Sequence, residues 1–326
     1  TPGVEHLHRF FNTFIDKGTL IGQIGGGKNK QTFTIDIVTI QSLNYRGEIK
    51  DDLTKYGQII VDECHHISAV SFEKVMKKVE AKYVCGLTAT PMRKDGLHPI
   101  MMMQLGPIRY KVTAKSNAKV HSFEHILHPR YTNFKCSIPN DTKQIQKIYK
   151  EIVHDSARNY LIFDDVLKAL NEGAAPLILT ERLEHVKILE EMFKNFVKNI
   201  IVLTGGMKSK EQLEKLNVLQ NLNMNEERLI IATGKYIGEG FDNARLDTLF
   251  LVMPLSWKGT LQQYVGRLHR AHDNKSVVKV YDYIDQKVPM LQKMFDKRLK
   301  AYQSMGYKMV DEKNRNVSST EQIKLF

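Results

Sequence analysis

Short apolar runs alternate with amphipathic stretches along most of the chain, and the alternation recurs in two successive halves. In the first half, Ser71–Val79 repeats its apolar residues at helical spacing between two such runs. The runs predict strands at Leu20–Ile24, Thr34–Ile40, Gln58–Val61, Tyr83–Leu87 and Ile108–Val112. Because apolar strands that alternate with helices are typical of parallel sheets, we expect the middle three strands to share one mostly parallel sheet.

The second half shows the same alternation more regularly. Helices are predicted at Leu183–Phe196 and at Lys210–Asn221, where Ser209 and Gln212 fit a capping box. The tail is expected to form a long amphipathic helix that ends near Gly306. The strands predicted in this half are Pro176–Thr180, Asn199–Leu203, Leu229–Ala232, Thr248–Val252 and Val277–Tyr283.

These patterns divide the chain into four parts. Residues 1–112 and 151–286 are predicted as two α/β domains, and residues 287–326 as a helical tail. Residues 113–150 are mostly polar and irregular, which predicts a connector that carries one or two further strands. With 326 residues, 42% of them apolar, the chain can form two cores at the usual domain size of about 100–200 residues.

The chain is basic. Lysine and arginine outnumber aspartate and glutamate by 48 to 36, which gives a net charge of +12. This balance suits a polyanionic partner such as a nucleic-acid backbone, although many basic proteins bind none. Three cysteines without a CxxC pair predict reduced packing thiols rather than a zinc site or disulfides. Since no run is apolar enough to span a bilayer and no signal peptide is evident, we expect a cytoplasmic protein without membrane contact.

The first candidate catalytic residues are Asp62 and Glu63, which directly follow the third predicted strand. Carboxylates at the carboxyl end of a buried strand lie where an α/β sheet binds its ligand. Asp62 can hold Mg²⁺, usually through water, and Glu63 can orient or deprotonate an attacking water. The alternative is a chance pair of acids at a strand end.

A second string, GLTATP, follows the next strand and begins at Gly86. Its hydroxyls on Thr88 and Thr90 could form hydrogen bonds with Asp62 or Glu63 across adjacent strand ends. The alternative is an ordinary turn that Pro91 terminates. That alternative does not explain why the two strings occur together in this order.

A third string, QYVGRLHR, places Gln263, Gly266, Arg267 and Arg270 at the spacing i, i+3, i+4 and i+7. On a helix these residues share one face, and the apolar residues between them face a core. Two arginines on such a face suit phosphate recognition, because each guanidinium presents a fixed fork of donors. The alternatives are a capping box of Thr260 with Gln263 and two solvated arginines.

Three further strings carry hydroxyls or glycines at strand ends. Thr39-Ile-Gln41-Ser42 and Thr204-Gly205 each follow an apolar run, and IATGKYIGEGFD begins at Ile231 and contains three glycines. Glycine-rich loops after strands allow backbone amides to approach phosphates. Each string is weak evidence by itself.

In their order from Thr39 to Arg270, the strings resemble motifs Ib, II, III, IV, V and VI of superfamily 2 helicases and translocases of the DExH type, and the tail resembles those of restriction and conflict systems. The resemblance implies two RecA-like parallel-sheet α/β domains in tandem, with ATP and Mg²⁺ as cofactors. By position, Asp62 would hold Mg²⁺ through water, and Glu63 would activate water.

The remaining roles follow from the same resemblance. Gln263, Arg267 and Arg270 would engage the nucleotide, and Thr88 and Thr90 would couple the domains. Residues matching nucleotide-binding positions are Gly240 and Asp242. Residues matching nucleic-acid-binding positions are Thr39, Gln41, Thr204, Gly205 and Thr233.

The family's Walker A loop is expected well before Asp62, but only 61 residues precede it. The string Gly22–Lys28 has the GxxxxGK spacing, yet Asn29 replaces the serine or threonine that would ligate Mg²⁺. A strand-like run follows it where a P-loop must open a helix, so its glycines predict a hairpin turn. We therefore expect that the sequence begins after the Walker A loop and that the first domain is incomplete.

The expected function is ATP-driven translocation or unwinding of nucleic acid, with DNA favoured over RNA, in a restriction or conflict system. A missing N-terminal fragment or a nuclease would be a further partner. One alternative is a catalytically impaired nucleic-acid-binding remnant or one half of a split helicase, which the missing Walker A loop favours. Another is a different P-loop-like enzyme such as a small-molecule kinase, against which the Gln263–Arg270 string argues.

Overall fold

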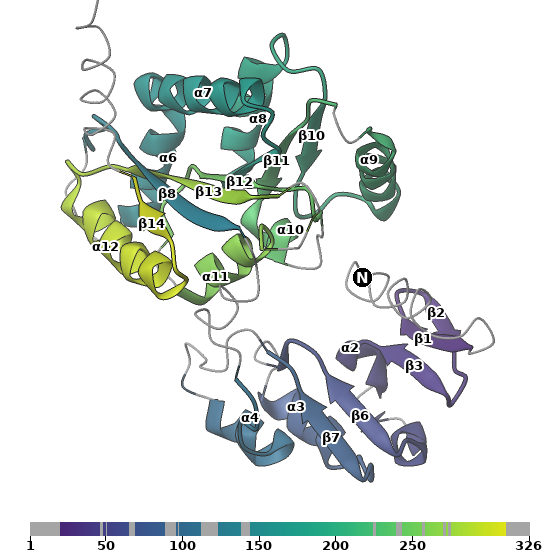
Figure 1. The fold of residues 1–326 in the computed structure, drawn as a ribbon. Coiled ribbons are helices and arrows are strands. Elements are labelled where there is room, and N and C mark those ends of the chain that lie inside the picture. The colour runs from purple at the N-terminus through teal and green to yellow at the C-terminus, as the bar shows by residue number, and fades with distance from the viewer. Residues whose placement is uncertain are drawn as a thin grey trace, which may run out of the picture. The chain divides into compact units, whose positions relative to one another are not determined.

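The computed structural model describes residues 20–45, 48–49, 51–64, 69–88, 96, 98–111, 123–137, 144–223, 226–238, 243–255, 258–269, 272 and 275–310. The chain divides into two compact units, Thr1–Lys111 and Val112–Phe326, and each is described by itself (Figure 1). In the described part of the chain, every helix is too short or too polar to cross a membrane.

The first unit contains small sheets with short helices. β1 and β3 are parallel, β1 and β2 form an antiparallel hairpin, and β6 and β7 form a separate parallel pair. Its elements are β1 (Ile21–Gly25), β2 (Lys28–Lys30), β3 (Ile35–Val38), α2 (Ile40–Leu43), β4 (Asn44–Tyr45), β5 (Glu48–Ile49), the 3-10 helix η1 (Asp51–Lys55), β6 (Gln58–Val61), α3 (Ala69–Met76), β7 (Tyr83–Gly86) and α4 (His98–Leu105).

Two predictions for this unit were wrong. The strands expected in one sheet fall into two, because β3 pairs with β1 whereas β6 pairs with β7. The strand expected at Ile108–Val112 is irregular over its described residues 108–111. This segment follows α4 through Gly106, whose φ of +83° turns the chain, and Ile108 and Tyr110 are exposed rather than packed in a sheet. Apolar composition alone therefore misidentified it.

The second unit is built on a seven-stranded sheet in the order β10-β11-β9-β12-β13-β8-β14, and every pairing is parallel. Its elements are β8 (Glu124–Tyr131), α6 (Ile145–His154), α7 (Ser156–Asn171), β9 (Pro176–Thr180), α8 (Leu183–Phe193), β10 (Ile200–Leu203), α9 (Ser209–Asn221), β11 (Leu229–Thr233), α10 (Gly234–Gly238), β12 (Thr248–Leu251), α11 (Lys258–Gly266), β13 (Val277–Ile284), α12 (Pro289–Ser304) and β14 (Lys308–Met309).

Helices cover both faces of this sheet (Figure 1). Leu177 and Leu179 of β9 point to the face packed by α9, α10, α11 and α12, whereas Ile178 points to the face packed by α7 and α8. This alternation follows from the two-residue period of a strand, and apolar residues on both faces are what a sheet buried on both sides requires. The result is a three-layered α/β/α unit.

The five strands predicted for this half are confirmed, each end lying within one residue of the prediction. The capping box at Ser209 was wrong: Ser209 is the first residue of α9, Lys208 is its N-cap, and Gln212 donates from Nε2 to the Tyr236 hydroxyl at 3.1 Å. The predicted connector contributes β8 and the beginning of α6 to the second unit. The tail helix was confirmed as α12, and Gly306 follows it with a φ of +86°.

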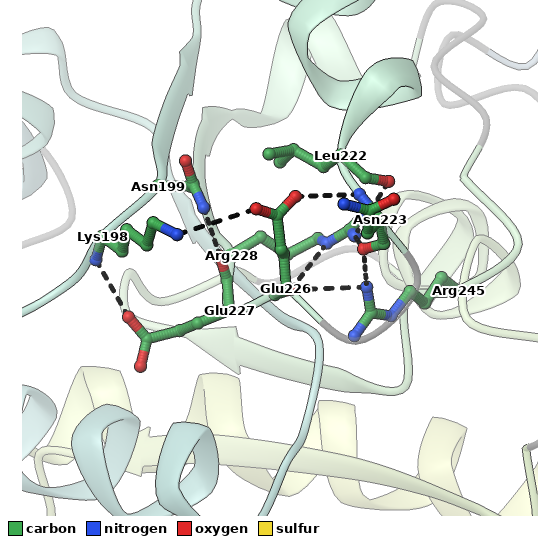
Figure 2. A network of polar contacts seen from close by, with 8 residues as sticks. All are labelled: Lys198, Asn199, Leu222, Asn223, Glu226, Glu227, Arg228 and Arg245. Atoms are coloured by element: carbon green, nitrogen blue, oxygen red, sulfur yellow. Dashed lines mark hydrogen bonds and ion pairs between the residues drawn. The ribbon is translucent and has the colours of Figure 1, made fainter.

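Polar groups at the amino ends of β10 and β11 are satisfied within the protein (Figure 2). Asn199 donates from Nδ2 to the carbonyl of Glu227 at 2.8 Å, and the guanidinium groups of Arg228 and Arg245 both donate to the carbonyl of Asn223. Burial and the neighbouring Arg245 lower the pKa of Arg228. These groups bond to one another, and parallel sheets bind ligands at the carboxyl ends of their strands, so groups for a ligand are expected at the opposite edge.

Candidate functional site at the carboxyl ends of the strands

The two acidic residues of the first unit lie beside the string that begins at Gly86. β6 and β7 are parallel with Val61 opposite Gly86, so their carboxyl ends meet at one edge. The pairing continues past both strands, because Leu87 donates its amide to Val61 at 2.8 Å and Cys64 donates its amide to Leu87 at 3.1 Å. Asp62 and Glu63 are thus held between two backbone contacts to the neighbouring chain segment.

Glu63 has a strained backbone. Its φ of +46° lies in the left-handed region, which a residue with a Cβ rarely adopts. Its amide donates to Oδ1 of the preceding Asp62 at 2.9 Å, and the Asp62 side chain is exposed. Strain of this kind persists only where the surroundings enforce it, and it is common at functional sites. The turn therefore holds two adjacent carboxylates at a fixed place on the strand edge.

The residues next to these two acids, Gly86 and Cys64, are closely packed. A Cβ at Gly86 would come 2.6 Å from Cδ1 of Leu105 in α4 and 3.3 Å from Sγ of Cys64, so a larger residue there would require the Leu105 side chain to shift. Cys64 is buried, and burial, followed by the charges of Glu63 and Asp62, raises the pKa of its thiol. All three cysteines are free, but the predicted packing role holds only for Cys64, since Cys136 is half-buried and Cys85 is exposed. Cys64 is thus a packing residue rather than a nucleophile.

The donor set fits the Mg²⁺ that the sequence implies. In the described part of the chain, no group of three histidine, cysteine or acidic side chains could enclose a metal ion. Mg²⁺ does not need such an enclosure, because it is commonly held by one or two carboxylates together with waters and substrate phosphates. The exposed Asp62 carboxylate at a strand end supplies that minimal requirement.

Thr39 and Gln41 lie at the end of β3, beside the end of β1. Thr39 donates its amide to the carbonyl of Ile24 at 3.2 Å, and its hydroxyl lies 2.6 Å from the hydroxyl of Ser42. Gly25 has a φ of +122°, and a Cβ there would come within 2.8 Å of both hydroxyls. The Gln41 side chain is exposed on α2. This edge therefore presents hydroxyl and amide groups over a glycine.

The glycines at Gly22–Lys28 form a hairpin, as predicted. Residues 25–27 all have positive φ and connect β1 to β2 with Gly25 opposite Lys28. The turn is tighter than expected, since Lys28 and Asn29 already belong to β2, and the run after it returns as β3 parallel to β1. This GxxxxGK string therefore does not form a phosphate-binding loop.

In the second unit, the ends of β10 and β11 are joined through their predicted site residues. Leu203 lies opposite Ala232 in the parallel register, and the amide of Gly205 donates to the hydroxyl of Thr233 at 3.0 Å. Thr233 is buried, whereas Thr204 is half-buried. The Gly205 amide is thus used within the protein, and Thr204 is the more exposed of the two threonines.

Sequence reasoning missed a contact centred on Gly234. A Cβ there would overlap both Oε1 of Glu181, which follows β9, and the phenol of Tyr264 in α11. Tyr264 donates its hydroxyl to Glu181 at 3.2 Å, and burial raises the pKa of each group. The signal was present in the acid that directly follows a predicted strand, but its partner, Tyr264, had been placed in the core. The contact links the starts of α8 and α10 to α11.

The helical face predicted for the third string was partly wrong. α11 ends at Gly266, so Arg267 lies in a turn, where its amide donates to the carbonyl of Tyr264 at 3.2 Å. The α-helix ends here because the amides after Gly266 donate to carbonyls three residues earlier instead of four. Leu261 and Leu268 are fully buried, as predicted for the core side, and Gln263 and Arg267 are half-buried.

The structure brings several predicted residues together but not all of them. The site residues outside the described part are Thr90, Gly240, Asp242 and Arg270. Asp62, Glu63 and Thr88 belong to the first unit, and Gln263 and Arg267 belong to the second.

Comparison with known proteins gives the class of the two units. The family model for the res subunit of type III restriction enzymes matches residues 4–93, and the conserved C-terminal domain of helicases matches residues 159–272. The solved structure of S. cerevisiae Dbp5 bound to RNA and ADP BeF3 has a TM-score of 0.59 at 12% identity, covering 93% of this chain and 73% of that chain. The fold consists of tandem RecA-like domains.

Individual relatives are also named as helicases or translocases. The chain is 28% identical over 290 residues to a predicted ATP-dependent RNA helicase of Acanthamoeba polyphaga mimivirus, which is 85% of this chain and 52% of that protein. It is 24% identical over 286 residues to DNA 3'-5' translocase XPB2 of Sulfurisphaera tokodaii, which is 76% of this chain and 62% of that protein. The chain spans about half the length of the curated relatives it matches. It belongs to the superfamily 2 helicases of the restriction-subunit type.

Proposed function

We propose that the chain is the motor portion of an ATP-dependent helicase or translocase that acts on nucleic acid, and on DNA in preference to RNA. The observation that carries the proposal is the position of Asp62 and Glu63 at the carboxyl end of a parallel strand pair, with Glu63 fixed in a left-handed conformation. Family membership adds the ATP-dependent chemistry that such a pair of carboxylates serves.

In this proposal, each acid has one task. Asp62 would hold Mg²⁺ through water, and the ion would supply positive charge beside the phosphates. Glu63 accepts a proton from, or orients, the water that attacks the terminal phosphate of ATP. Thr88 couples the first unit to the second. Gln263 and Arg267 contact the nucleotide from the second unit, where a guanidinium stabilises the negative charge of the transition state.

The nucleic-acid contacts fall at strand ends in both units. Thr39 and Gln41 in the first unit and Thr204 in the second present side chains that can donate to phosphate oxygens. Gly205 and Thr233 bond to each other, so they shape this edge in addition to any contact of their own. Such groups bind the backbone and read no sequence, which suits a motor that moves along its track.

The preference for DNA rests on relatives rather than on geometry. The restriction-subunit model covers the first unit, and the archaeal relative is named as a DNA translocase. The mimivirus relative is named as an RNA helicase, which makes the comparison of the two nucleic acids a necessary test. A restriction or conflict system with a nuclease partner is the setting that the restriction-subunit model suggests.

The test measures ATP hydrolysis by the purified chain with single-stranded DNA, double-stranded DNA and RNA, beside Glu63→Gln. The proposal expects stimulation by nucleic acid, strongest with DNA, and its loss in the variant. Binding measured at several salt concentrations should weaken steeply as salt rises, because counterions are released from the nucleic acid. Absence of binding at low salt would reject a nucleic-acid motor.

A second candidate is a nucleic-acid-binding module that does not hydrolyse ATP by itself, as a remnant or as half of a split helicase. The hairpin at Gly22–Lys28 favours it, since this GxxxxGK string cannot hold a triphosphate. Salt-sensitive binding without any nucleotide turnover would support this candidate over the first. Turnover restored by an added N-terminal fragment would identify a split enzyme.

A further inference from the structure

The segment that contains Arg267 is fixed at its beginning by a residue from the C-terminal helix. Arg298 of α12 donates from Nη1 to the carbonyl of Leu255, shortly before α11 begins at Lys258, at 2.7 Å. Its Nε and Nη2 donate to the two carboxylate oxygens of Asp282 in β13 at 2.7 and 2.8 Å. One guanidinium therefore ties the chain before α11 to the central sheet.

This arginine has little freedom to move. The Arg298 and Asp282 side chains are 2% and 0% exposed, and Tyr302 donates its hydroxyl to the same carboxylate at 3.0 Å. A buried ion pair is stable only if its geometry is good and its remaining polar atoms are bonded. Here both carboxylate oxygens are bonded, and three guanidinium nitrogens donate. The guanidinium that contacts Leu255 is consequently fixed in position by its buried ion pair.

The other end of the segment is fixed by Tyr307. The hydroxyl of Tyr307 lies 3.0 Å from Nε2 of His269, two residues after Arg267. Tyr307 is buried, its amide donates to the carbonyl of Tyr302 at 3.1 Å, and β14 directly after it pairs with β8. His125 of β8 packs edge-on against His269 with ring centroids 4.6 Å apart. His269 thus lies between the sheet and the tail.

The apolar residues between these two ends share a core with the tail. Leu261, Val265 and Leu268 pack in one cluster with Ala301 of α12 and with Met305, the residue that caps its C-terminal end. Figure 1 shows α12 beside α11 in the second unit. The tail therefore contacts the Arg267 segment at its beginning, along its apolar side and at its end.

We propose that residues 289–309, called here the C-terminal clamp, position Arg267 for the nucleotide, with Tyr307 and Arg298 as positioning residues. The inference rests on the proposed function for the role of Arg267 and on the contacts above for the clamp itself. Because Arg267 lies in a turn rather than in α11, the helix alone cannot fix its direction. The clamp supplies the constraint that the helix end lacks.

The test compares Tyr307→Phe with Tyr283→Phe. Tyr283 is a matched control, since it is also buried and donates its hydroxyl to a carboxylate, Asp165, at 2.9 Å, but it belongs to the core packed by α7 and α8. Each variant loses one hydroxyl of a buried tyrosine and the hydrogen bond that this hydroxyl makes. A merely structural role predicts the same result for both.

Hydrogen exchange gives the first readout. The amides of Arg267, Leu268 and His269 donate to carbonyls three residues earlier. Tyr307→Phe is expected to speed their exchange about fivefold, the effect of losing one hydrogen bond, while Tyr283→Phe leaves them unchanged. Equal exchange of these amides in wild type and Tyr307→Phe would overturn the clamp. So would an equal increase in both variants.

Steady-state hydrolysis gives the second readout. Tyr307→Phe is expected to lower kcat several-fold with little change in KM for ATP, because Arg267 acts on charge that develops in the transition state. Tyr283→Phe should keep the wild-type kcat, and an equal loss in both would overturn the positioning role. If wild type shows no turnover, the proposed function fails, whereas the exchange data still decide the clamp. Arg298→Lys, which keeps the charge but lacks the fork, should loosen the amides near Lys258.

Discussion

Gly234 lies directly against Tyr264, close enough that a Cβ would come 2.8 Å from Cζ of the phenol ring. The tyrosine ring is buried and holds Glu181 by its hydroxyl, so it cannot move aside without breaking that bond. Gly234→Ala should therefore cost about 1–3 kcal/mol of unfolding free energy, the usual cost of overpacking. Urea unfolding of the purified variant measures it.

Gly266 provides the control for this prediction. It lies at the end of the same helix as Tyr264, but a Cβ there would meet nothing within 4 Å. Gly266→Ala should raise the unfolding free energy by no more than about 1 kcal/mol, because alanine loses less backbone freedom on folding than glycine. If the two variants proved equally stable, the close contact around Gly234 would be wrong.

Because the Glu63 backbone is strained, replacing this residue by glycine should affect stability and activity in opposite directions. A left-handed φ costs a residue with a Cβ about 1–2 kcal/mol, and glycine avoids this cost. Glu63→Gly should leave the unfolding free energy unchanged or raise it by up to about 1 kcal/mol, while any ATP hydrolysis is lost. Denaturant unfolding and a phosphate-release assay on the same preparation would show both effects.

The adjacent Asp62 is the control, because its φ is not positive and its carboxylate accepts the Glu63 amide. Asp62→Gly should lower stability, since it removes this bond and gains nothing from relief of strain. A stabilised Asp62→Gly together with a destabilised Glu63→Gly would contradict the described turn.

A buried histidine predicts acid sensitivity of the second unit. His185 is fully buried between Asn159 and Thr180, and burial, reinforced by the charge of Arg158, lowers its pKa to about 3. Between that value and its ordinary pKa of about 6.5, the unfolded chain binds a proton that the folded chain does not. Stability is therefore complete above about pH 6.5 and falls by ~1.4 kcal/mol per unit as the pH decreases toward 3.

Unfolding of wild type and His185→Gln at pH 7 and pH 5 would test this. The wild type should lose ~2 kcal/mol more than the variant between the two pH values. Other titrating groups contribute to both proteins and cancel in the difference. Parallel losses would show that His185 titrates normally and is not buried as described.

The sequence predicted the second unit well for a physical reason. Runs such as Pro176–Thr180 are apolar throughout because both faces of the sheet are covered, and breaks in the apolar pattern mark their ends. The α4 helix in the first unit was missed, because its apolar residues, including consecutive methionines, show no helical periodicity. Local pattern also could not reveal the Gly234–Tyr264 contact or the end of α11 before Arg267, which depend on packing between distant segments.

The last prediction concerns protection of equivalent strands in the two units. β11 lies between β10 and β9, and all of its residues are buried, whereas β6 pairs with β7 alone among the described residues and Ile60 is 56% exposed. Free energies of local opening range from about zero to the global value, and they are lowest where few apolar contacts hold a strand. Amides of Ile59–Val61 should exchange at least about tenfold faster than those of Leu229–Ile231.

The same difference has a consequence for association. A strand pair whose two outer edges are unpaired among the described residues, and which exposes apolar side chains, here Ile60 and Tyr83, is a template for pairing with another segment or chain. Amide exchange of Ile59–Val61 should then slow as protein concentration rises if copies associate there, and Ile60→Lys should remove that dependence. Equal protection of both strands in a monomer would instead mean that β6 is covered, and the exposed pair described here would be wrong.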